Sequence, residues 1–430
     1  MLLIILTIGF FALLVYGKIC GFTLQNLLKM ALSGIRPAKN IVFVMLLVGA
    51  LTALWRAGGT IAAIVSLASG ALIPSIFLPS VFLLCAIVSV LTGTSIGTAA
   101  TMGVISMSVG NAMGISPAIV GGSALAGAYL GDRSSPVSTS AILVSEVTKT
   151  NLYDNLKAMV RTAIIPFVIS ILLYGIIGTI LLNMGPSESG CGVSPIPIAD
   201  LFKKHFHLSW ITFLPAIAIL ALSIFRINVK WTMLTSIAIS AGICVNIQGF
   251  SIAETLKFAF WGYEAPAEIK TMMSGGGIFK MIPMLCTVLI SMTYAGIFKG
   301  TNTLRHVYAF AEKTAQKIRP FGCTILTATL TGMLCCNQTI SIVLTNDICQ
   351  KIIPDAAKRA LYIENSAVII APLIPWSVAS LIPLGMMEAP TNSILFAFYL
   401  FLIPLVNLFL NQHDSHQKQH NDRERRQHAD

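Results

Sequence analysis

Apolar segments about as long as a membrane-crossing helix most constrain what this chain can fold into. A helix needs about 20 residues to cross the hydrocarbon core of a bilayer. Uninterrupted apolar runs cover residues 1–17, 40–55, 74–92, 162–184, 209–225, 229–249, 282–299, 321–336 and 391–411. Only 10% of the 430 residues are charged, whereas a soluble domain averages about 25%. The sequence therefore predicts an all-α polytopic membrane protein.

Two further apolar regions, 93–148 and 337–388, are interrupted by Gly, Pro, Ser, Thr and Asn. Each is long enough for two crossings and a re-entrant piece, so we expect about 11 or 12 transmembrane segments in total. Lipid cannot satisfy the backbone groups that a helix break exposes, so such breaks must be buried in protein or line a cavity. We expect the binding site at these two breaks.

Short motifs recur in the same order in the two halves of the chain. Matching pairs are Ser-Gly at 33–34 and 274–275, Leu-Thr-Gly at 91–93 and 330–332, Pro117 and Pro354, and YLGD at 129–132 with YIEN at 362–365. We infer two internal repeats, of expected inverted topology, with broken or re-entrant helices at matching positions. This organisation is typical of secondary transporters.

The repeats divide the chain into four parts. They are a first transmembrane repeat at 1–184, a central loop and linker span at 185–228, a second transmembrane repeat at 229–411, and a polar tail at 412–430. We expect the tail to be disordered and cytoplasmic. The net charge of +11 reflects Lys and Arg in short loops, which points to a lipid bilayer as the partner. Basic patches with interleaved aromatic residues are missing from the sequence, so nucleic acid is not an expected partner.

The stretch Gly93-Thr94-Ser95-Ile96-Gly97 allows three interpretations: a hydrolase elbow, a helix-packing motif or a polar helix break. A nucleophilic serine needs a base and a preceding strand. The histidines outside the tail, His205, His207 and His306, lie in loop-like segments, and the run before Gly93 is too long and apolar for a strand. We therefore expect no enzyme, while packing and a helix break both stay open.

Polar side chains at the two breaks are the candidate site. Intramembrane ionisable residues are functional candidates by default, so Asp132 and Glu364 are predicted to couple ions and protons, although Asp132 could instead pair with Arg133 or lie in a water-exposed turn. Candidate ligands of an ion or substrate are Thr94, Ser95, Thr98, Ser135, Ser138, Asn337, Gln338, Thr339, Asn365 and Ser366. Hard oxygen ligands suit Na⁺, and the predicted Na⁺ site consists of Asp132, Ser95, Thr98, Asn337 and Thr339. No resident cofactor is expected; Na⁺ and H⁺ would be cargo.

At these residues the chain resembles the NhaC-type Na⁺/H⁺ antiporter family of bacteria, which includes a malate/lactate exchanger. The motifs that carry the resemblance are GTSIGTAATMGV at 93–104, GAYLGDRSSPVS at 127–138, SGGG at 274–277, LTGMLCCNQTISIVLT at 330–345 and ENSAVIIAPLIPWS at 364–377. The resemblance extends from about residue 30 to 410. It implies a multi-pass protein of the bacterial inner membrane. Our hypothesis for the mechanism is alternating access at the repeat interface, and a homodimer is left open as the assembly.

Some residues depart from the family pattern. The Asp-Thr pair expected after SP-x-S is Thr139-Ser140, and the expected Glu-Asp-Ser-Gly-Thr reads ENSAV from Glu364. Two carboxylates are therefore missing from the ion path implied by the resemblance. The resemblance implies Na⁺/H⁺ antiport first, and Na⁺- or H⁺-coupled exchange of an organic acid or amino acid as the alternative.

Overall fold

The computed structural model describes residues 2–35, 39–69, 74–183, 198–225, 227–301 and 318–410. The polar tail predicted at 412–430 lies outside these ranges. Over the described residues the regular structure is helical, apart from one isolated antiparallel bridge between Tyr263 and Gly275. The prediction of an all-α chain is confirmed.

The helices of the first half are α1 (Leu2–Ile19), α2 (Leu24–Ile35), α3 (Lys39–Ala57), α4 (Thr60–Ser69), α5 (Pro74–Thr92), α6 (Ser95–Thr98), η2 (Ala99–Gly103), α7 (Val104–Ala112), α8 (Pro117–Ser134), α9 (Thr139–Thr148) and α10 (Leu152–Asn183). Those of the central part are α11 (Ile198–His205), η3 (Trp210–Phe213), α12 (Leu214–Ile224), α13 (Val229–Asn246), α14 (Ile252–Trp261), η4 (Ala267–Ile269), α15 (Lys270–Met273), η5 (Phe279–Met281) and α16 (Ile282–Gly300). The last group is α18 (Pro320–Cys335), α19 (Gln338–Cys349), α20 (Ala356–Glu364), α21 (Ala367–Ile370), η6 (Ala371–Leu373), α22 (Val378–Met386) and η7 (Thr391–Phe396), followed by an apolar helix at Phe398–Leu410.

Several helices have the length and composition of membrane spans. Within the described ranges four qualify, namely Ser75–Thr92, Leu152–Leu181, Val229–Asn246 and Phe279–Phe298, and two bent pairs raise the number to six. Five other apolar helices are only 10–17 residues long, shorter than the roughly 20 residues of a full crossing. The structure thus shows a multi-pass membrane protein, and the total of 11 or 12 crossings stays a prediction.

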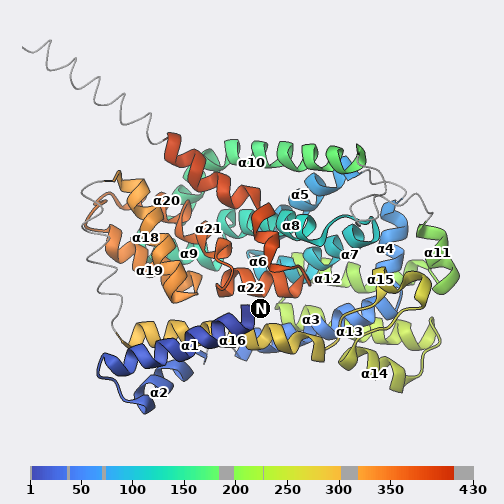
Figure 1. The fold of residues 1–430 in the computed structure, drawn as a ribbon. Coiled ribbons are helices and arrows are strands. Elements are labelled where there is room, and N and C mark those ends of the chain that lie inside the picture. Colours follow the sequence, from blue (N-terminus) through green and yellow to red (C-terminus); the bar gives the residue numbers. More distant parts are fainter. Residues whose placement is uncertain are drawn as a thin grey trace, which may run out of the picture.

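Helix α10 shows how the surface meets lipid. An exposed apolar side chain recurs every fourth residue along it, at Ile164, Val168, Leu172, Ile176 and Ile180, so successive members are neighbours on a row that winds around the helix. Their exposed fractions lie between 48% and 58%. A continuous apolar row of this kind fits contact with acyl chains rather than with water. Figure 1 shows α10 lying along the outside of the molecule, over α5 and α8.

The two helix breaks have the same local construction. After α5, Gly93 takes a left-handed backbone conformation (φ 69°), and Thr94 then caps α6 by accepting a hydrogen bond from the Gly97 N–H at 3.3 Å. After α18, Cys336 is left-handed (φ 53°), and the Asn337 side chain caps α19 by accepting from the Ile340 N–H at 3.3 Å. The predicted breaks at both positions are therefore present, whereas the inverted topology of the repeats stays a prediction.

Close contact between α5 and α8 positions the first break. A Cβ on Gly127 would lie 2.8 Å from the Cys85 Cβ, and one on Gly131 would lie 2.5 Å from the Val90 nitrogen. These positions accept only glycine without a shift of one helix, as in small-residue packing between membrane helices. Because Asp132 follows Gly131 directly, this packing also fixes the depth of Asp132 against α5.

We expect Gly131→Ala to destabilise the protein by about 1–3 kcal/mol through overpacking against α5. The measurement is thermal unfolding of the full chain in detergent micelles. Gly242→Ala in α13 is the matched control, because a Cβ there meets no heavy atom within 4 Å. Equal transition temperatures for the two variants would contradict the proposed close packing.

Candidate functional site

Asp132, near the end of α8, lies at the centre of a buried cluster of hydroxyl groups. It is 4% exposed. Its carboxylate accepts hydrogen bonds from the Ser138 hydroxyl at 2.8 Å and from the Ser95 hydroxyl at 3.3 Å. Ser95 is the first residue of α6, after the helix break, and Ser138 caps α9. The break and the SSPVS turn thus bring both hydroxyls to one carboxylate.

A row of hydroxyls connects Asp132 to a cavity between the two halves of the chain. The Ser138 and Ser140 hydroxyls are hydrogen-bonded at 2.8 Å. Ser140 also lines a cavity of about 280 Å³ between α9 and α19, to which Glu146 contributes. From the second half, Gln338 and Thr339 line the same cavity. Polar groups of α9 in the first half of the chain and of α19 in the second half therefore line one cavity.

Arg133 turns away from its neighbour Asp132 and connects three other segments: α10, the end of α20 and the last helix. Its guanidinium donates to the Thr162 hydroxyl at 3.0 Å, to the Met159 carbonyl at 3.4 Å and to the side-chain oxygen of Asn365. It also donates to the Tyr399 hydroxyl at 3.4 Å. Both alternatives for Asp132 are wrong: the residue is buried rather than in a water-exposed turn, and the Arg133 guanidinium bonds elsewhere instead of pairing with it.

Glu364, the last residue of α20, is the least compensated ionisable group at this site. It is fully buried, and both carboxylate oxygens lack a hydrogen-bond partner among the described residues. Arg133 reaches its backbone instead, with Nε donating to the Glu364 carbonyl at 3.3 Å. A buried carboxylate without a donor is costly. Such a group is poised to take up a proton or a metal cation.

Most other predicted ligands form hydrogen bonds with backbone groups at or near the two breaks. Thr98 donates to the Thr94 carbonyl at 2.9 Å, Ser135 to the Val90 carbonyl at 2.7 Å, Ser366 to the Tyr362 carbonyl at 2.6 Å and Gln338 to the Val368 carbonyl at 2.9 Å. Thr94 and Asn337 act as helix caps. Thr339 is exposed in the α9–α19 cavity. In the predicted Na⁺ site, Ser95 therefore bonds Asp132 directly. Thr98 and Asn337 lie at the two breaks, and Thr339 lies at the α9–α19 cavity.

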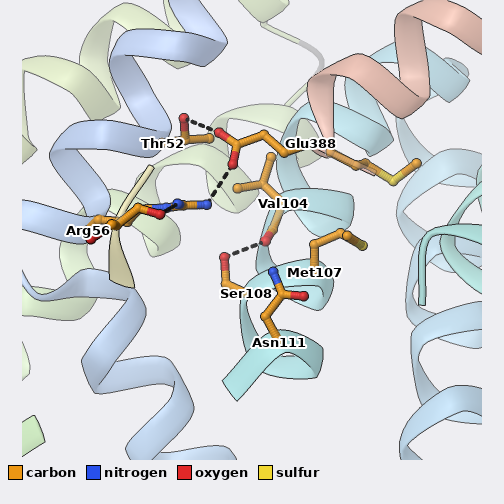
Figure 2. Close-up of a pocket in the computed structure, with 9 residues that line it drawn as sticks. Thr52, Arg56, Val104, Met107, Ser108, Asn111 and Glu388 are labelled. Carbon is orange, nitrogen blue, oxygen red and sulfur yellow. Dashed lines mark hydrogen bonds and ion pairs between the residues drawn. The ribbon is translucent and has the colours of Figure 1, made fainter. Parts of the chain in front are cut away.

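A second pair of charged residues inside the membrane region was not predicted from the sequence. Arg56 near the end of α3 and Glu388 just after α22 form an ion pair at 2.7 Å, and both line a cavity of about 170 Å³. Figure 2 shows the pair opposite the α7 residues Ser108 and Asn111. The rule that intramembrane ionisable residues are functional candidates would have selected Glu388, which follows the apolar run IPLGMM.

Broken helices, buried carboxylates and a lipid-facing surface together define a polytopic membrane protein of the kind that moves ions or small solutes. Comparison with known proteins gives the particular family. The model of the Na⁺/H⁺ antiporter family matches residues 1–142 and 127–411. The chain belongs to the Na⁺/H⁺ antiporter family, and the resemblance expected from the motifs is confirmed.

Curated relatives align over most of their length. The chain is 26% identical to the malate-2H⁺/Na⁺-lactate antiporter of Bacillus subtilis over 91% of this chain and 84% of that protein. It is 25% identical to the Na⁺/H⁺ antiporter NhaC of Alkalihalophilus pseudofirmus, over 92% and 86%. It is also 25% identical to the arginine/ornithine antiporter ArcD of Halobacterium salinarum, over 87% and 79%. These relatives are antiporters, so the family is one of transporters.

Arg133→Lys should lower stability by about 2 kcal/mol, because an ammonium cannot reproduce the fork of bonds that a guanidinium donates. Thermal unfolding in detergent micelles measures the effect. Arg161→Lys on the exposed face of α10 is the matched control and should leave the transition unchanged. If both variants unfold at the wild-type temperature, the contacts of Arg133 do not hold these segments together.

Proposed function

We propose that this protein exchanges Na⁺ for H⁺ across a bacterial inner membrane, with Asp132 and Glu364 as the cation-binding groups. The observation that carries the proposal is the carboxylate of Glu364, which is fully buried with both oxygens unpartnered among the described residues. A structural role would leave such a group bonded. A group that binds and releases a cation in each cycle needs free oxygens.

The two carboxylates have different surroundings, which suggests different tasks. Asp132 receives two hydroxyl donors, from Ser95 and Ser138, and the same hydroxyl oxygens can turn their lone pairs toward Na⁺. The Arg133 guanidinium bonds Glu364 only at its backbone carbonyl, so the Glu364 carboxylate has no hydrogen-bond donor among the described residues. In the proposed cycle Asp132 binds Na⁺ and Glu364 takes up the proton, and the positive charge of Arg133 opposes occupation of both sites at once.

A route for the ions is consistent with this division. The hydroxyl row from Asp132 through Ser138 and Ser140 leads to the cavity between α9 and α19. Glu146 at that cavity adds a carboxylate that attracts cations. Because α9 belongs to the first half and α19 to the second, relative movement of the halves would open or close this route. Alternating access follows from such a movement.

The first test is removal of each carboxylate. We expect Asp132→Asn and Glu364→Gln each to reduce ²²Na⁺ uptake driven by a pH gradient in proteoliposomes by about tenfold or more, because each loses a cation-binding charge. Asp347→Asn, at an exposed position of α19, is the matched control and should transport at the wild-type rate. Wild-type exchange in both Asp132→Asn and Glu364→Gln would refute the proposed roles.

Competition between the two cations gives a second test. If Na⁺ and H⁺ use the same pair of carboxylates, binding of one weakens binding of the other. Each fall of one pH unit on the Na⁺ side should raise the half-saturating Na⁺ concentration by up to about tenfold while the maximal rate is retained. Initial rates over a grid of pH and Na⁺ concentration measure this. A half-saturating Na⁺ concentration that stays constant while the maximal rate falls would argue against competition between Na⁺ and H⁺ at this pair of carboxylates.

A second candidate function is coupled exchange of a small organic solute. The observation that favours it is the cavity beside Arg56 and Glu388, which lies apart from the Asp132 cluster and shares no lining residue with it. Relatives named for malate and lactate exchange and for arginine and ornithine exchange belong to the same family. Counterflow of labelled organic acids and amino acids in proteoliposomes distinguishes this function from exchange of cations alone.

A further inference from the structure

The cavity beside Arg56 is built around a fixed pair of opposite charges. Arg56 Nη2 donates to the Glu388 carboxylate at 2.7 Å, and Nη1 donates to the Ser274 carbonyl at 2.6 Å. The second carboxylate oxygen of Glu388 accepts from the Thr52 hydroxyl at 3.0 Å. Figure 2 shows the bonds of Arg56 and Thr52 to Glu388 on one side of the cavity. The positive and negative charges therefore lie side by side at one wall.

Retention of this pair is difficult to explain by stability alone. The Arg56 side chain is 11% exposed and that of Glu388 is 27% exposed, and desolvating two charges often costs as much as their attraction returns. The Arg56 Nε is buried and has no hydrogen-bond partner among the described residues. Glu388 also occupies the left-handed position (φ 56°) that follows the C-cap of α22, a position that helix ends most often give to glycine or asparagine.

The size of the cavity limits what it can hold. Its volume of about 170 Å³ is close to that of an engineered cavity of about 150 Å³ that binds benzene. The ligand should therefore have roughly six to eight non-hydrogen atoms. The Ser108 hydroxyl and the Asn111 amide on the opposite wall supply neutral hydrogen-bonding groups.

The charge of the cavity selects the class of solute. Because Arg56 and Glu388 compensate each other, a monoanion would bring one uncompensated charge into this membrane region, at a high cost. A solute that carries one carboxylate and one ammonium leaves the total charge at zero. Its carboxylate can bond Arg56 and its ammonium can bond Glu388, so that the solute replaces the internal pair.

We propose that the Arg56–Glu388 cavity is the binding site of a small zwitterion, a 2-amino acid with a short side chain. The proposal rests on the second candidate function above, solute exchange, and gives its substrate class. It also places the solute on the same broken helix as the cation. Ser95 begins this run of helix, the π-helical turn η2 follows, and Ser108 and Asn111 lie in α7 beyond it.

The π-helical turn gives this arrangement a physical link. Such turns occur frequently at functional sites. A Cβ on Gly103, the last residue of η2, would lie 2.5 Å from the Met387 sulfur, and Met387 precedes Glu388. A solute that separates Arg56 from Glu388 would therefore shift the residue that packs on η2, and cation binding at Ser95 and Asp132 would act on the other end of the same segment.

The test uses matched pairs of solutes that differ only in an ammonium or a hydroxyl group: L-alanine with L-lactate, and L-valine with L-2-hydroxyisovalerate. Binding to the full chain in detergent micelles is measured by calorimetric titration and by the ligand-induced shift of the unfolding temperature. We expect at least one amino acid to bind at least tenfold more tightly than its hydroxy acid partner. Equal binding within both pairs, tighter binding of a hydroxy acid, or no binding of any of the four solutes would overturn the proposal.

A charge-neutralising variant makes the test sharper. Glu388→Gln removes the partner of the ammonium and leaves Arg56 uncompensated, so the order within the binding pair should reverse in favour of the hydroxy acid. Asp347→Asn should keep the wild-type order. A Glu388→Gln protein that is folded but loses affinity for both solutes equally would show a merely structural role for the pair. If Glu388→Gln does not fold, the comparison of amino acid and hydroxy acid binding to the wild-type protein still tests the proposal.

Binding is measured at equilibrium, without an ion gradient, so this test and the test of Na⁺/H⁺ exchange fail separately. If the protein exchanges ²²Na⁺ but binds no amino acid, the proposed zwitterion site is refuted and the proposed Na⁺/H⁺ exchange is not. If the protein binds an amino acid and both Asp132→Asn and Glu364→Gln exchange ²²Na⁺ at the wild-type rate, the proposed roles of Asp132 and Glu364 are refuted instead.

Discussion

The structure depends on one constraint: a helix broken inside a membrane must find partners for its exposed backbone within the protein. Each break finds them in a later segment of its own half. Near the first break, the Val90 carbonyl accepts from the Ser135 hydroxyl at 2.7 Å. At the second, the Met333 carbonyl accepts from the Trp376 indole at 3.0 Å, and the Cys336 carbonyl accepts from the Val378 N–H at 2.9 Å.

This constraint explains why the motifs that carry the family resemblance come in pairs along the chain. The SSPVS segment covers the first break, and PLIPWS covers the second. The covering segments carry the site with them, because Ser138 lies in the first and α20 with Glu364 comes shortly before the second. Backbone satisfaction and the proposed cation binding therefore use neighbouring stretches of sequence.

The sequence predicted the breaks because clusters of Gly, Ser, Thr and Asn interrupt apolar runs there, and it selected Asp132 and Glu364 because acidic residues in apolar surroundings are rare. It could not assign the hydroxyls. Thr98 and Ser366 bond a carbonyl four residues earlier, whereas Ser95 bonds a carboxylate on another helix, and no local pattern distinguishes the two. The pair of Arg56 and Glu388 was also out of reach, because its members are far apart in sequence and only the packing of α3 against α22 brings them together.

The contacts of Arg133 with Met159 and Thr162 also place the Asp132 cluster beside one end of the apolar part of α10. Charged residues of α10 end at Arg161, and the helix then continues to Asn183. At 1.5 Å per residue, the part beyond the contact is about 30 Å long, which matches the whole hydrocarbon core. The contact with Arg133 therefore lies at the charged end of an apolar helix segment that is long enough to cross the hydrocarbon core by itself.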